Sequence, residues 1–184
     1  VSYNLLTGSS GFYGMQSRET GAASTTMSWT LDNSVNWSSV GISINGSGST
    51  PPVVVETKTA TISASSTTVT VAGVDPAGSN RLLTVAVSFV NNSSQTVSGV
   101  TFGGVALTAV ASGSVSNGTS SRVEWWRLIA PSATKADIVV TFSAAVTDAV
   151  VGATAYYSAN QTTPITDTTT GTGTYTLAGA VGGY

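Results

Sequence analysis

The sequence contains no cysteine and no histidine, and charged residues make up only 8% of its 184 residues. Without cysteine the chain can form neither a disulfide nor a zinc–thiolate site, and it has no thiol nucleophile. Without histidine it lacks the commonest general base and the commonest transition-metal ligand. We therefore expect no catalytic residue, no metal ion and no cofactor.

Charge of either sign is scarce, with six Lys and Arg residues against eight Asp and Glu residues and a net charge of −2. Nucleic-acid partners are not expected, because the sequence has no basic patch to neutralise phosphates. A membrane span is not expected either, since no run of about 20 apolar residues occurs. The chain begins at Val1 without a methionine or a signal peptide, which favours a processed or excerpted segment.

Hydroxyl and β-branched residues take the place of charge. About a third of the residues are Ser or Thr, and there are 20 glycines. Thr and Val suit the pleated, half-buried positions of strands, so the composition predicts an all-β protein. A surface solvated by hydroxyls and amides is typical of proteins exposed outside the cell, and we expect an extracellular location.

Strands are predicted by a period of two in hydrophobicity. In 81–90, Leu83, Val85, Val87 and Phe89 share one face. Segment 123–129 is mixed on both faces, which suits a central strand of a sandwich, and segment 150–157 is similarly apolar on both faces. Further strands are expected at 26–31, 40–44, 59–63, 68–72, 99–102, 105–111 and 138–142. About a dozen short strands separated by Gly, Pro and Asn predict a β-sandwich of jelly-roll or Greek-key type.

Residues 45–52, with the sequence NGSGSTPP, resemble a linker. They separate a short piece, 1–44, from a main sandwich, 53–184. The apolar residues of the short piece share one face: Met27, Trp29, Leu31, Val40, Ile42 and Ile44. A two- or three-stranded piece is marginal in water by itself, so this face must dock against a sandwich.

Two docking arrangements satisfy this requirement. Segment 1–44 could fold back on its own sandwich, or it could complete the sandwich of a neighbouring copy, within one chain or between chains. Eight linker residues span at most about 26 Å, which suits head-to-tail neighbours. Such a contact does not close on itself and propagates as a filament. We favour this second arrangement, in which a natural domain would run from 53 to 184 and then through 1–44.

Three stretches carry a resemblance to a known type of domain: VTFGGVAL at 100–107, RVEWWRLIAP at 122–131 and VVGATAYYSANQTTPI at 150–165. They resemble the tandem-repeat, jelly-roll-like β-sandwich of secreted bacterial surface and adhesin-like proteins. The closing strands of that domain resemble 27–29 and 36–44, which here come first instead of last. The resemblance implies a packing module without catalytic residues. The expected function is a structural subunit or repeat of an extracellular filament or stalk.

The alternative function is a carbohydrate- or surface-binding adhesin module. Trp29 and Trp125 lie on faces expected to pack in a core, whereas Trp37 and Trp126 have the opposite parity. Exposed indole rings at Trp37 and Trp126 could contact glycans.

A hydrolase is the weakest hypothesis, because no two carboxylates form a recognisable pair. Glu124 lies between Arg122 and Arg127, and a cross-strand ion pair is the expected role. Residues 75–80 lack the dense acidic spacing of a calcium loop, so a simple turn is predicted there.

Overall fold

The computed structural model describes residues 2–7, 13–18 and 35–175, and the regular secondary structure within these ranges is entirely β. Thirteen strands lie in the described ranges: β1 (Ser2–Thr7), β2 (Tyr13–Arg18), β3 (Val35–Ile44), β4 (Val53–Ile62), β5 (Ser66–Val74), β6 (Leu82–Phe89), β7 (Val97–Phe102), β8 (Val105–Ala106), β9 (Thr108–Asn117), β10 (Ser121–Ile129), β11 (Ala136–Val146), β12 (Ala149–Tyr157) and β13 (Ile165–Tyr175).

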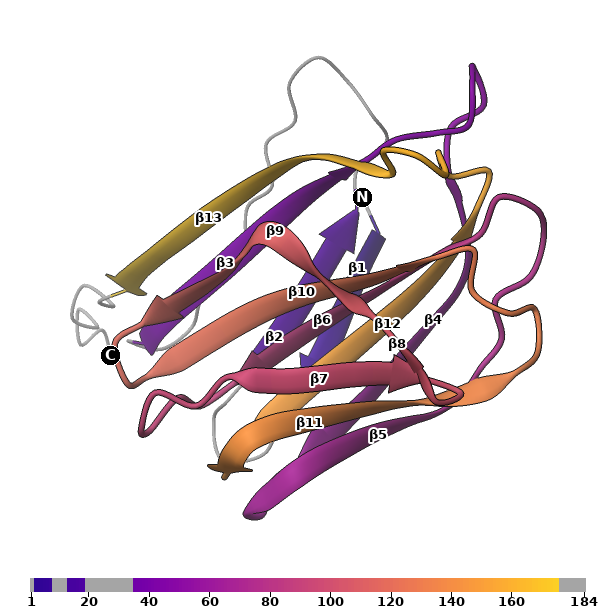
Figure 1. Ribbon diagram of the computed structural model, residues 1–184. Helices are drawn as coiled ribbons and strands as arrows, with labels where there is room; N and C mark the ends of the chain where they lie inside the picture. The colour runs from indigo at the N-terminus through magenta and orange to yellow at the C-terminus, as the bar shows by residue number, and fades with distance from the viewer. Residues whose placement is uncertain (1, 8–12, 19–34, 176–184) are drawn as a thin grey trace, which may run out of the picture.

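Two antiparallel sheets form the body of the molecule (Figure 1). The central sheet has the order β4-β12-β6-β10-β9, and a four-stranded sheet with the order β5-β11-β7-β8 packs against its inner face. The all-β sandwich predicted from the sequence is confirmed.

The main core fills the space between the two sheets. Leu83, Val85, Val87 and Phe89 of β6 all point into it and are fully buried, as their alternation predicted. The Phe89 ring meets the Phe142 ring of β11 edge to face, with 5.1 Å between the ring centroids. This contact joins β6 of the central sheet to β11 of the four-stranded sheet near the end of β6.

Two further pairs of strands lie on the outer face of the central sheet, which is the face turned away from the four-stranded sheet (Figure 1). Strands β3 and β13 pair antiparallel and lie over β9 and β10; we call this pair the β3–β13 ribbon. Strands β1 and β2 form a second ribbon, which lies against β12 and β4. The central sheet is therefore covered on both faces.

Double coverage explains the burial of the central strands. Every residue of β12 except Tyr157 is buried, and Thr84, on the outer face of β6, is only 1% exposed. Strands β10 and β12 each lie between two neighbouring strands of the central sheet, as the sequence predicted for 123–129 and 150–157. The polar side of β6 meets protein rather than water because the ribbons cover it.

Residues 45–52 form an anchored turn, whereas the sequence predicted a flexible linker. The backbone N–H of Asn45 donates to Pro164 O, that of Ser47 to Ser158 O, and that of Asn160 to Asn45 O. A hydrogen bond from the Thr50 N–H to Ser47 O closes the turn, with Gly48 at a φ of 62°. Hydrogen bonds to the 158–164 segment hold this connection in place despite its Gly and Ser content.

Replacing Gly46 with alanine is expected to destabilise the protein by about 1–3 kcal/mol. A Cβ at Gly46 would lie 2.0 Å from the Thr50 carbonyl oxygen, so the turn must move to accept it. The control is Gly99→Ala, because a Cβ there meets no atom within 4 Å. Urea unfolding measures both variants, and equal midpoints would contradict a close fit at Gly46.

Candidate functional site

The inner side of the β3–β13 ribbon carries the described half of the predicted docking face. Val40 and Ile42 of β3 pack with Ile165 of β13 against a cluster formed by Val110, Val123 and Trp125 on the central sheet. Ile44 packs against a second cluster, formed by Leu82, Tyr156 and Ala159. All three predicted β3 residues thus contact the outer face of the central sheet of their own chain. The other three, Met27, Trp29 and Leu31, lie outside the described residues.

Polar contacts hold one end of the ribbon on the hairpin that joins β9 to β10. The Asn117 Nδ2 group donates to Gly173 O at 2.8 Å and to Trp37 O at 3.2 Å, so it bonds to both strands of the ribbon. Asn36 Nδ2 donates to Ser120 Oγ at 2.8 Å. The Ser38 and Ser121 hydroxyl oxygens lie 2.9 Å apart. These contacts set the position of β3 along β10.

The two tryptophans predicted to be exposed have different surroundings. Trp37 faces away from the central sheet and is 37% exposed. Trp126 points between the two sheets, where it packs against the main core and is only partly exposed. Its indole nitrogen is buried without a hydrogen-bond partner in the described part of the chain. Of these two rings, only that of Trp37 presents a large exposed surface on the sheet exterior.

The expectation that Trp125 packs in a core is confirmed, whereas Trp29 lies outside the described residues. Trp125 is 9% exposed and belongs to the cluster beneath the ribbon, as predicted for a core residue. Tyr156 is buried, whereas its neighbour Tyr157 is 37% exposed. Alternate residues of a strand point to opposite faces, which accounts for both pairs of neighbours.

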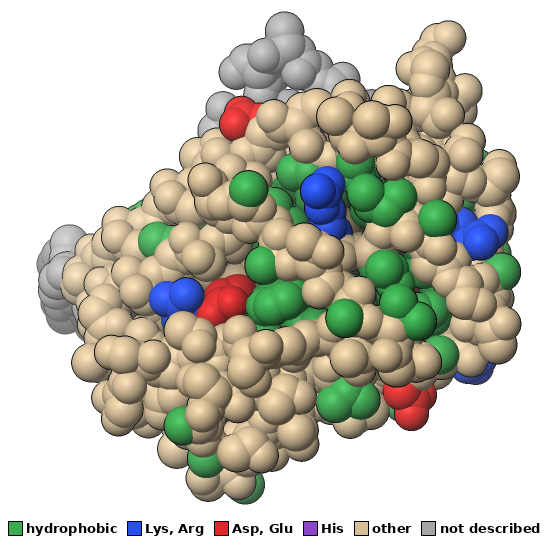
Figure 2. Space-filling view, in the orientation of Figure 1, with side chains coloured by type: hydrophobic (Ala, Val, Ile, Leu, Met, Phe, Trp, Pro, Cys, Tyr) green, Lys and Arg blue, Asp and Glu red, His purple; other side chains and the backbone are tan. Residues whose placement is uncertain are grey.

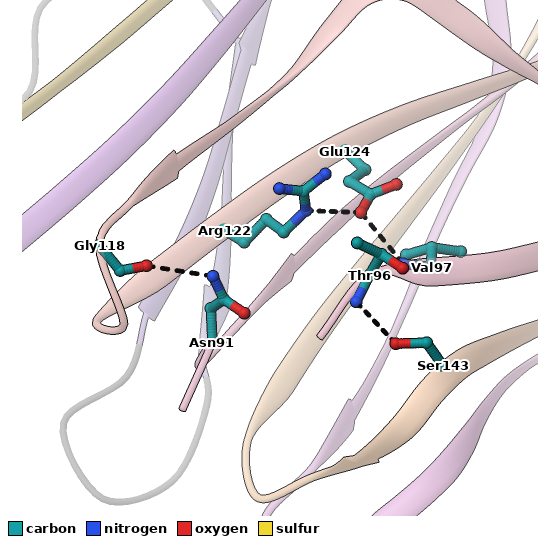
Figure 3. Close-up of polar contacts among 7 residues, drawn as sticks. All are labelled: Asn91, Thr96, Val97, Gly118, Arg122, Glu124 and Ser143. Carbon is teal, nitrogen blue, oxygen red and sulfur yellow. Dashed lines mark hydrogen bonds and ion pairs between the residues drawn. The ribbon is translucent and has the colours of Figure 1, made fainter. Parts of the chain in front are cut away.

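Glu124 forms a buried ionic junction between the two sheets (Figure 3). Its Oε1 atom lies 2.7 Å from Arg122 Nε and accepts a hydrogen bond from the Val97 N–H at 3.0 Å. The partner Arg122 lies two residues earlier on the same strand, so the pair is not cross-strand as the sequence predicted. Residues i and i+2 share a face of a strand, which excludes Arg127 as a partner.

The Val97 contact has a further consequence for the edge of the four-stranded sheet. Strand β8 pairs with β7 only at Thr101 and Phe102, so the first half of β7 has no strand partner on that side among the described strands. An unpaired strand edge invites pairing with another chain. The Glu124 carboxylate occupies one donor of this edge. Sequence parity did not predict this role.

A second group of charged residues lies where β4 of the central sheet meets β5. Gly73 has a φ of 60°, its N–H donates to Asp137 Oδ1 at 2.8 Å, and Lys58 Nζ donates to its carbonyl oxygen. Glu56 lies 3.4 Å from Lys58 Nζ and accepts from the Asp75 N–H at 2.7 Å. The charges satisfy backbone groups at a β-bulge, so their geometry is that of a structural network.

The surface of the described residues offers little else for chemistry. Figure 2 shows a face dominated by uncharged polar side chains and backbone, with few charged side chains. One open hollow of about 350 Å³ is lined largely by apolar side chains and backbone near Phe102, Val105 and Pro131. Within the described ranges, no three Asp or Glu side chains are grouped closely enough to hold a metal ion. No helix there is long and apolar enough to cross a membrane.

The chain matches no protein-family model, no curated protein and no solved structure.

Proposed function

We propose that this chain is a structural subunit or repeat of an extracellular filament or stalk, assembled head to tail by β-strand complementation. The observation that supports this most is the docking of β3. The apolar side of β3 covers Val110, Val123 and Trp125 of the central sheet. The 45–52 turn is the connection between β3 and the rest of the sandwich. The hydroxyl-rich, charge-poor composition fits an extracellular setting, and the role is mechanical and requires no catalysis.

Complementation requires β3 to leave its own central sheet and cover that of a neighbouring copy. The contacts are identical in both cases, because the neighbour presents the same face. An opening of the turn at Gly48 and Ser49 would break the bond from the Thr50 N–H to Ser47 O. The bonds of Asn45 and Ser47 to the 158–164 segment could form again on the neighbour. Pro51 and Pro52 favour an extended chain beyond this hinge.

A disulfide trap tests the exchange, and the absence of natural cysteine makes the trap clean. The Ser38 and Ser121 hydroxyl oxygens lie 2.9 Å apart, so cysteine sulfurs introduced at these two positions would point toward each other. We expect the double variant Ser38→Cys, Ser121→Cys to link subunits in assembled material. Non-reducing electrophoresis should then show a ladder of covalent oligomers that collapses on reduction.

Native material, examined first by electron microscopy, should consist of filaments with an axial repeat close to the length of one sandwich. The single variant Ser38→Cys is the control, since it should give no ladder. A fully oxidised double variant that stays monomeric in filaments would contradict strand exchange. Discrete particles the size of one chain would contradict the filament itself.

A further inference from the structure

We propose that the Trp37 indole is a binding platform for a pyranose ring of a neutral oligosaccharide. This site lies on the outward side of the β3–β13 ribbon, opposite the docking face. It adds a binding function to the structural role and does not depend on whether β3 is exchanged.

The indole lies flat on the backbone of β13. Trp37 pairs with Gly173 in the ribbon, and Gly171 lies two residues further along. A Cβ at Gly173 would lie 2.8 Å from Cζ2 and 3.1 Å from Nε1 of Trp37, and one at Gly171 would lie 3.3 Å from Cζ3. Strand side chains ordinarily stand roughly perpendicular to the sheet. The two glycines are what allow this ring to lie over the strand instead.

One face of the ring is therefore occupied by glycine backbone, and the exposed part of Trp37 lies on the other side. Trp37 is one of the few large apolar side chains that are more than a third exposed among the described residues. The face of an aromatic ring carries negative potential, which attracts the weakly positive C–H groups on the apolar face of a pyranose. A ring already held in place loses little conformational freedom on binding, and this favours affinity.

The surroundings of the indole favour an uncharged, hydroxyl-rich ligand. The outward positions next to Trp37 on the ribbon hold Val35, Ser39 and Gly41 on β3, and Thr169 on β13. Ser39 Oγ lies at the edge of the platform, 3.3 Å from the Cβ position of Gly171. Hydroxyl groups both donate and accept hydrogen bonds, as sugar hydroxyls do. Asp167, which pairs with Ser43, is the one charged residue among the described outward positions of the ribbon, and it lies six residues along β13 from Gly173.

Tyr157 provides a matched comparison. It is also 37% exposed, and it also contacts a glycine, Gly78. The atoms of Tyr157 nearest to a Cβ at Gly78 are its own Cβ at 2.7 Å and Cγ at 3.1 Å, so the glycine supports the base of the side chain. Tyr157 thus has the exposure of a platform without the flat seat beneath its ring.

The test is a titration of the protein with cellohexaose, chitohexaose and laminarihexaose, followed by the indole N–H signals in NMR spectra. We expect saturable shifts of the Trp37 signal, assigned by its loss in Trp37→Ser, with at least one of these sugars. Gly173→Ala keeps the indole but adds a Cβ that displaces the ring from the β13 backbone, and it should weaken binding at least tenfold. Tyr157→Ala should bind as the parent protein does.

Two outcomes would overturn the proposal: no shift of the Trp37 signal with any of the three sugars, or undiminished binding by both Gly173→Ala and Trp37→Ser. Backbone amide signals of Val40 and Ile42 report whether the ribbon stays docked in each variant. Trp37→Ser keeps the backbone carbonyl that accepts from Asn117, so it should preserve the ribbon if Gly173→Ala does not.

Discussion

Replacing Phe89 with alanine should lower the free energy of unfolding by about 3–5 kcal/mol, the largest single effect that we expect. Phe89 is fully buried in the main core and meets the Phe142 ring across the two sheets. The substitution removes both the buried area and the edge-to-face contact, and close packing prevents the surrounding strands from filling the space.

Thermal unfolding followed by circular dichroism measures this effect. For a chain of this size a loss of about 4 kcal/mol lowers the melting temperature by roughly 8–16 °C. Phe89→Leu is the control, because it retains most of the volume and should cost clearly less. Similar melting temperatures for Phe89→Ala and the parent protein would show that packing of Phe89 in the core contributes little to stability.

Replacing Glu124 with alanine should cost about 3 kcal/mol, because both partners of its carboxylate lose their bonds. The Val97 N–H would remain in a buried position without an acceptor, and the Arg122 guanidinium would lose its ion pair. The unpaired edge of β7 would also lose the group that accepts from the Val97 N–H, so the variant should aggregate more readily during refolding, when this edge is not yet buried.

Glu56→Ala is the matched control for Glu124→Ala. Glu56 also pairs with a cation and accepts a backbone N–H, but its side chain is 25% exposed against 8% for Glu124. Water can replace the lost partners of Glu56, so the cost there should stay near 1 kcal/mol or below. Chemical denaturation compares the two variants. Equal losses of stability would show that the burial of Glu124 at the sheet junction does not increase the cost of removing its carboxylate.

Hydrophobic alternation predicted the central strands well. In β6 the alternation placed four residues on the core side, and all four are fully buried. In β10 and β12 apolar residues on both faces predicted central strands, and both strands are interior strands of the central sheet. The ribbons that cover the outer face of these strands were not predicted. Buried positions of a strand need apolar side chains, so they can be recognised directly in the sequence.

Strand β13 could not be found in this way. Its sequence, ITDTTTGTGTY, has no alternation of apolar and polar residues and contains two glycines. Threonine suits both sides of a ribbon that is only partly buried, so neither side is marked by hydrophobicity. The glycines look like a loop signal in the sequence, but in the structure they accommodate the Trp37 ring. The role of these glycines depends on β3, which lies far away in the chain, so β13 alone does not reveal it.

The predictions of a flexible linker at 45–52 and of a cross-strand ion pair at Glu124 were wrong for the same reason. Gly and Ser residues allow many backbone conformations, but the hydrogen bonds to Ser158 and Pro164 select one conformation for residues 45–52. The Glu124 ion pair was foreseen, but its second partner is a backbone N–H on the other sheet. Local sequence identifies neither contact, because both depend on how distant strands come together.

The pairing of β3 with β13 has a consequence for the order of folding. These strands lie at opposite ends of the main described segment, so the ribbon forms by closing one of the longest loops in the fold. Contacts between distant residues form slowly, and β13 emerges late during synthesis. We expect Val110, Val123 and Trp125 to stay uncovered until then. During that interval a strand from another copy, already complete, can compete for the same surface.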